Sequence, residues 1–137
     1  MDIRIVILFA IILIVAGLLL AIIGRSRRGS RRLDIEKYRC KWLQIESSVS
    51  RDNEASHHLA ILNADKLLDS ALRDKGVGGE TMGERMKRVS FRNANAVWAA
   101  HKLRNQIAHE SDVKISYDTV RRALASFKQA LKDVGAI

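Results

Sequence analysis

The sequence of 137 residues contains no proline, a single cysteine and few aromatic residues. One cysteine excludes an intrachain disulfide and any zinc site built from several thiolates. The absence of proline, together with abundant alanine, leucine, arginine and lysine, favours helix, because proline interrupts helices and these four are good helix formers. The GxSxG, HExxH and Walker patterns are also missing, which sets aside the enzyme classes that need them. We therefore expect an all-α protein without a metal or a cofactor.

Positive charge predominates, with 24 lysine and arginine residues against 15 aspartate and glutamate residues and a net charge of +9. Five arginines are concentrated in residues 25–32, and Asp2 offsets Arg4. The rest of the chain keeps 18 basic and 14 acidic residues, a surplus of four. This mild surplus permits nucleic-acid binding but does not indicate it, because solubility alone accounts for such a balance.

The N-terminal segment lacks charge over 19 consecutive residues, from Ile5 to Ile23. As a helix they would span about 28 Å, which matches the hydrocarbon core of a bilayer. A buried soluble helix would usually show a polar face. A cleaved signal peptide would carry its positive charge before the apolar run and end in an A-x-A site, which Ala21-Ile22-Ile23-Gly24 lacks. Residues 1–24 are therefore predicted to form a single transmembrane anchor.

A basic collar at residues 25–32 follows the anchor. Its five arginines, against one on the N-terminal flank, predict a cell (plasma) membrane protein with its C-terminal domain in the cytoplasm. The same side chains would contact anionic lipid headgroups, each contributing about 1 kcal/mol near the surface. An RNA-binding arm is the alternative role of this segment. The arginines concerned are Arg25, Arg27, Arg28, Arg31 and Arg32.

Residues 33–137 are predicted to form an antiparallel, up-and-down bundle of four main helices plus one short helix. The main helices are expected at 33–50, 53–74, 93–108 and from Ser116 onward. The glycine cluster at 76–79 is expected to be a turn, and Thr81-Met82-Gly83-Glu84 matches a capping box that opens the short helix. The apolar positions of the second helix are Leu59, Leu62, Leu67, Ala71 and Leu72.

The stretch from Trp98 to Glu110 contains the side chains best suited to chemistry. His101, Asn105 and His109 are four residues apart and therefore lie along one helical face. Arg104 and His109 are about 140° apart around an ideal helix, and both can converge where the helix ends. An arginine can bind a phosphate with two hydrogen bonds, and a histidine can transfer protons near neutral pH. Together they suit cleavage of a phosphodiester.

The segment Arg104-Asn105-Gln106-Ile107-Ala108-His109 resembles the R-x(4-6)-H motif of HEPN (higher eukaryotes and prokaryotes nucleotide-binding) domains. These domains are small helical bundles with the motif near the end of a late helix, and the resemblance covers residues 33–137. It implies a metal-independent endoribonuclease acting on cytoplasmic RNA, with an active site at a homodimer interface. Arg104 and His109 would be catalytic in each subunit, and Asn105 would orient them or the phosphate.

A non-catalytic domain is the alternative to the ribonuclease hypothesis, because some HEPN-like domains keep the fold without activity. Arg104 would then pair with an acidic neighbour, and His109 would cap the helix C-terminus. The bundle would act as a membrane-anchored adaptor that dimerises or docks a partner.

Other candidate residues have simpler roles. His57 and His58 are adjacent and make a poor metal pair, so they are expected on the solvated surface. Trp42 and Trp98 are expected in the core or an interface, and Cys40 has no evident partner histidine.

Overall fold

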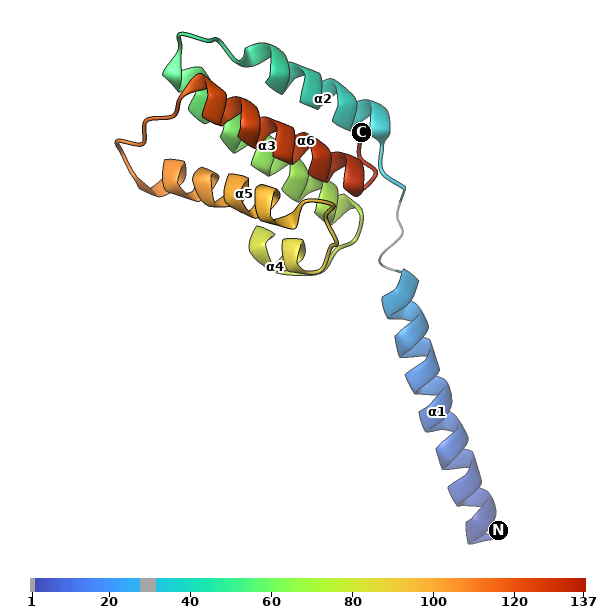
Figure 1. The fold of residues 1–137 in the computed structure, drawn as a ribbon. Coiled ribbons are helices and arrows are strands. Elements are labelled where there is room, and N and C mark those ends of the chain that lie inside the picture. Colours follow the sequence, from blue (N-terminus) through green and yellow to red (C-terminus); the bar gives the residue numbers. More distant parts are fainter. Residues whose placement is uncertain (1, 28–31) are drawn as a thin grey trace.

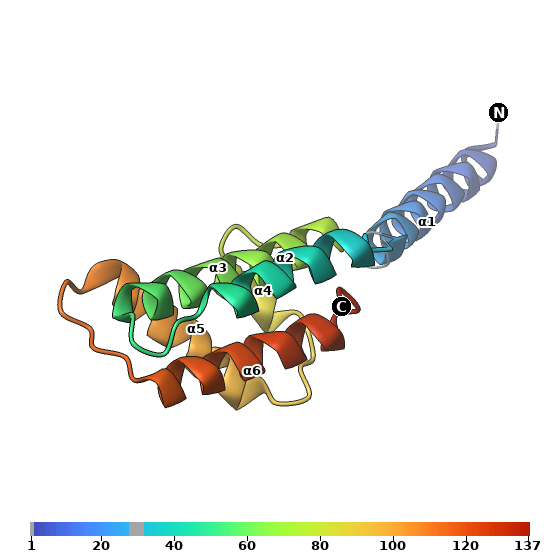
Figure 2. The same ribbon diagram turned by 90° about the horizontal axis from the view of Figure 1, so that it is seen from above.

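The computed structural model describes residues 2–27 and 32–137, and within these ranges the chain forms six α-helices and no strand. The predicted all-α class is confirmed. Helix α1 comprises Ile3–Arg27. The other five helices pack together, and the four long ones run along a common direction (Figures 1 and 2). Their bounds are α2 (Ile35–Ser48), α3 (Glu54–Asp74), α4 (Met82–Lys87), α5 (Ala94–His109) and α6 (Tyr117–Asp133).

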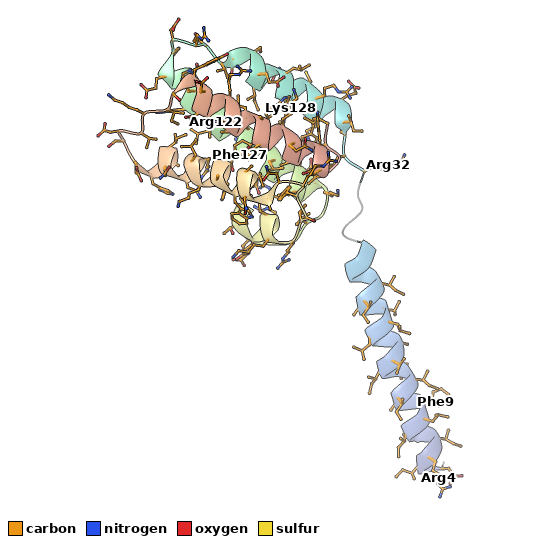
Figure 3. All side chains as sticks on the ribbon, viewed as in Figure 1. Arg4, Phe9, Arg32, Arg122, Phe127 and Lys128 are labelled. Carbon is orange, nitrogen blue, oxygen red and sulfur yellow. The ribbon has the colours of Figure 1, made fainter. Side chains whose placement is uncertain are left out.

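Helix α1 contains a segment, Ile3–Ile23, that is long and apolar enough to cross a membrane. No residue of this segment is buried by the rest of the described chain, and Figure 3 shows side chains such as Phe9 projecting outward. A core helix of a soluble domain would be mostly buried. The helix continues to Arg27, three residues beyond the predicted end of the anchor. The collar side chains of Arg25, Arg27, Arg28 and Arg31 lie outside the described residues.

Each bundle helix begins at a residue whose side-chain oxygen accepts a hydrogen bond from the backbone N–H three residues later. This bond satisfies one of the donors that every helix N-terminus leaves unpaired. The predicted starts at Asn53, Thr81 and Ser116 are thereby confirmed. The five capping residues are Asp34, Asn53, Thr81, Asn93 and Ser116.

The capping box at α4 differs in one detail from the predicted pattern. Thr81 Oγ1 accepts from the Glu84 N–H at 3.2 Å, as expected. The Glu84 carboxylate, however, accepts from the N–H of Glu80 at 2.7 Å, one residue before the cap. This bond stabilises the ionised carboxylate and therefore lowers the pKa of Glu84 below its usual value.

The glycine turn after α3 is also confirmed. Gly76 has a φ of +88°, a conformation that glycine adopts without steric cost. The Gly76 N–H binds Arg73 O and the Val77 N–H binds Leu72 O, both at 2.9 Å. This is the Schellman arrangement, which ends a helix by satisfying its last carbonyl groups.

Helix α3 lies at the centre of the bundle and packs against α2, α4, α5 and α6. The core contains apolar side chains from all five bundle helices and the turns between them. Figure 3 shows Phe127 of α6 pointing into the bundle and Arg122 pointing away from it. Helix α3 runs antiparallel to both α2 and α5, which places the middle of α3 against the middle of α5.

Helix α3 turns Ala60, Ile61, Ala64 and Leu68 toward its neighbours and leaves Leu59 55% exposed. One prediction about this helix is wrong. His57 was expected on the surface but is 4% exposed. Its Nδ1 lies 3.1 Å from Ile115 O and its Nε2 lies 2.8 Å from Ser50 O. The ring thereby joins the α2–α3 and α5–α6 connections. The position of His57 beside His58 in the sequence could not predict these tertiary contacts.

Helices α2 and α3 are joined at one end by Tyr38 and Asp74. The buried Tyr38 hydroxyl donates to Asp74 Oδ2 at 2.6 Å. This bond is the main cause that lowers the pKa of Asp74, and the charge of Lys37 lowers it further. Burial is the main cause that raises the pKa of Tyr38 well above its usual range, and the bond to Asp74 raises it further.

We predict that Tyr38→Phe lowers the free energy of unfolding at neutral pH by about 1 kcal/mol, because Asp74 is half exposed and its bond is screened by solvent. A carboxylate with a lowered folded-state pKa stabilises the fold above its unfolded pKa of about 3.9, and this contribution disappears as the pH falls through the folded value. Urea unfolding of the full chain in detergent micelles should therefore show the difference at pH 7 and lose it near pH 2. Tyr117→Phe is the matched control, and an equal loss at both pH values would contradict the assignment.

Candidate functional site

An open cleft of about 770 Å³ lies between α3 and α5, with the start of α4 at its border. Helix α5 contributes His101, Arg104 and Asn105, three of the four polar residues singled out from its sequence. The remaining lining residues come from α3, from the two residues before α4 and from α4 itself: Leu59, Leu62, Asn63, Asp65, Lys66, Asp69, Glu80, Thr81, Met82, Gly83 and Arg85.

Asp65 lies at the floor of this cleft and is only 3% exposed. It is on the buried face of α3, among Ile61, Ala64 and Leu68, which are fully buried. A carboxylate in such a position is costly unless charged or hydrogen-bonding partners compensate it. Both partners come from α5: Asp65 Oδ1 is 2.7 Å from His101 Nδ1, and Oδ2 is 3.3 Å from Arg104 Nε.

Arg104 is oriented from two sides. Its Nε faces Asp65 within ion-pair distance but outside hydrogen-bond geometry, and its Nη1 donates to Asn105 Oδ1 at 2.9 Å. The side chain is 36% exposed. Within the described part of the chain, Nη2 makes no hydrogen bond, so one edge of the guanidinium is available to a ligand in the cleft. A planar guanidinium with a free edge suits an anion with several oxygens.

His101 is held more tightly than Arg104, with 12% of its side chain exposed. Because a carboxylate accepts hydrogen bonds, Nδ1 carries the hydrogen that Asp65 receives. The opposite nitrogen, Nε2, lies 3.4 Å from Asn105 Nδ2. Trp98 packs edge-on against the ring, with centroids 6.0 Å apart. The ring is thus fixed by contacts on both of its nitrogens and by an aromatic neighbour.

His109 lies apart from these residues. It is the last residue of α5, it is exposed, and it does not line the cleft. It is five positions after Arg104, about 7.5 Å along the helix axis. The backbone cap at this end is made by the Glu110 N–H, which binds Gln106 O at 2.8 Å.

A second ion-pair cluster supports the cleft wall beside α4. The buried Arg85 binds Asp69 through Nε and Nη2, each at 2.7 Å, and also donates to the Gly79 carbonyl. Arg73 binds the other oxygen of Asp69 at 2.9 Å. Each of the three guanidinium nitrogens of Arg85 therefore has a protein partner. This arginine holds α4 against α3 and is not available to a ligand.

Sequence reasoning missed Asp65. The pattern that could have found it is an acidic residue among small and apolar ones, Ile61-Leu-Asn-Ala-Asp65-Lys-Leu-Leu68, at a position on the buried face of α3. A charged residue there requires a partner from another helix. Within the described residues no group of three or more histidine, cysteine, aspartate or glutamate side chains is arranged to hold a metal ion.

Comparisons of the chain with protein-family models, with curated proteins and with solved structures found no match.

Proposed function

We propose that this chain is a membrane-anchored, metal-independent endoribonuclease of the HEPN type that cleaves cytoplasmic RNA. The observation that carries the proposal is the guanidinium of Arg104, which stands in an open cleft with one edge unoccupied and its orientation set by Asp65 and Asn105. Phosphodiester cleavage needs such a group, because negative charge accumulates on the phosphate oxygens in the transition state.

His109 and Asn105 complete the proposed set. His109 transfers the proton of the attacking 2′-hydroxyl or of the leaving oxygen, which its exposed place at the end of α5 permits. Asn105 accepts from Arg104 Nη1 and so keeps the guanidinium directed into the cleft. Hydroxyl attack on the neighbouring phosphorus yields a 2′,3′-cyclic phosphate and a 5′-hydroxyl end.

A homodimer is part of this proposal. Two large apolar side chains of the bundle, Leu43 of α2 and Leu59 of α3, are more than half exposed. Leu59 lines the cleft and also a neighbouring groove of about 300 Å³ between α2 and α3. A second copy that covers Leu59 would border the cleft and remove apolar surface from water.

The non-catalytic alternative has an observation of its own in favour. Arg104 pairs with the buried Asp65, so the same contact also serves as a clamp between α3 and α5. In that case the bundle is an adaptor, and substitutions at Arg104 change stability without changing any cleavage of RNA.

We propose that the bundle faces the cytoplasm from the cell membrane. The support is the excess of arginine after the apolar segment, and these arginines would contact anionic headgroups.

The cleavage assay tests the proposed function. We expect the full chain in detergent micelles to cleave single-stranded RNA in the presence of EDTA and to leave 2′,3′-cyclic phosphate ends. Arg104→Ala and His109→Ala should each lower the rate by about 10²-fold or more, because each removes a group that acts in the transition state.

Lys102→Gln is the control, since Lys102 is an exposed neighbour on α5 outside the cleft. Intact RNA after incubation with the wild-type chain, or equal rates in all four proteins, would contradict the proposal. The first result would favour the adaptor.

The orientation can be tested with the native thiol, because Cys40 is the one cysteine of the sequence and is exposed at the surface of α2. A membrane-impermeant maleimide should label Cys40 only after the cells are permeabilised. In a Cys40→Ser background, Asp2→Cys should be labelled in intact cells. Labelling of Cys40 from outside intact cells would reverse the proposed orientation.

A further inference from the structure

The cleft contains a polar pair that the Arg104 and His109 motif does not explain. Asp65 and His101 lie at its floor, 2.7 Å apart, and His101 Nε2 is directed toward Asn105 and the side of the cleft. Asp65 could compensate Arg104 without also holding a histidine. The additional contact fixes the orientation of an imidazole that lines the same cleft as the Arg104 guanidinium.

The contact with Asp65 also determines the tautomer of His101. The carboxylate accepts the hydrogen of Nδ1, so in the neutral ring the lone pair is on Nε2. The Asn105 Nδ2 group, an amide donor 3.4 Å from Nε2, is compatible with that assignment. A carboxylate that orients an imidazole, with the distal nitrogen free to accept a proton, is the arrangement that activates hydroxyl groups in hydrolases.

We propose that His101, positioned by Asp65, is the general base of the cleft and accepts the proton of the RNA 2′-hydroxyl. This inference rests on the proposed ribonuclease function. It divides the proton transfers between two histidines of α5, with His101 as the base and His109 as the acid. Arg104 lies between them in sequence, three residues after His101 and five before His109.

The reaction balances with these three side chains. His101 Nε2 removes the 2′-hydroxyl proton while the 2′ oxygen forms a bond to the adjacent phosphorus. The bond from phosphorus to the 5′ oxygen breaks, and that oxygen takes a proton from the protonated His109. The products are a 2′,3′-cyclic phosphate and a 5′-hydroxyl. Exchange with water then returns both histidines to their starting forms.

The spacing along α5 suits this division. His101 and His109 are about 12 Å apart along the helix axis, and Arg104 lies between them along that axis. In-line displacement needs its base and its acid on opposite sides of the phosphorus. In the proposed complex the phosphate is therefore held by Arg104 between the two histidines.

The pH dependence of cleavage is the distinguishing measurement. If the base is His101, the rate rises with pH as His101 loses its proton and falls as His109 loses its own. The charged side chains that line the cleft with His101 contribute to where that rise occurs. They are Asp65, which contacts His101 directly, Lys66 and Asp69 of α3, Glu80 before α4, Arg85 of α4 and Arg104 of α5.

We expect His101→Gln to lower the rate of the full chain by about 10²-fold to 10⁴-fold and to abolish the rising limb of the pH profile. His101→Ala should regain part of its activity when imidazole is added, which loss of a purely structural contact would not allow. Asp65→Asn should lower the rate while His109→Ala should remove the falling limb. Lys102→Gln should leave both limbs in place.

The outcomes separate the two proposals. A wild-type chain that does not cleave RNA overturns the proposed function and this inference together. An active wild type whose His101→Gln variant keeps the same rate and the same rising limb overturns the role of His101 alone. Circular dichroism of each variant identifies loss of fold, and imidazole rescue of His101→Ala decides the question if His101→Gln does not fold.

Discussion

The arrangement of the cleft depends on one buried carboxylate. Asp65 lies on the buried face of α3 among Ile61, Ala64 and Leu68, so its charge must be compensated from another helix. Helix α5 supplies that compensation with His101 and Arg104, each bound to a different oxygen. The same contact joins the two central helices and directs the polar residues of α5 into one place. The contact of Asp65 with α5 therefore both stabilises the packing of α3 on α5 and positions the polar side chains of the cleft.

The elements of the fold could be predicted from the sequence because they follow from local chemistry. Capping side chains such as Asn53 and Ser116, the glycine turn at Gly76 and the apolar periodicity of α6 act over a few residues. The error arose where tertiary packing decided the outcome. His57 was expected on the solvated surface, but it is buried between the carbonyl groups of Ser50 and Ile115, and the contact with Ile115 joins segments 58 residues apart.

The candidate site could be predicted only in part for the same reason. The polar residues of α5 are adjacent in sequence, so helical spacing placed His101 and Asn105 on one face and put Arg104 beside them. Asp65 is 36 residues earlier than His101, and only the antiparallel packing of α3 on α5 brings the two together. Spacing also predicted that His109 would converge with Arg104 at the helix end, but His109 is exposed there and does not line the cleft.

Asp65 fixes His101 with its Nδ1 hydrogen toward α3 and its Nε2 toward Asn105. Nitrogen-15 NMR of the imidazoles in the full chain in micelles, with His101→Gln used to assign the signals, measures this directly. We expect neutral His101 to be protonated at Nδ1 and unprotonated at Nε2. A neutral ring protonated at Nε2, or one that exchanges between both forms, would contradict it.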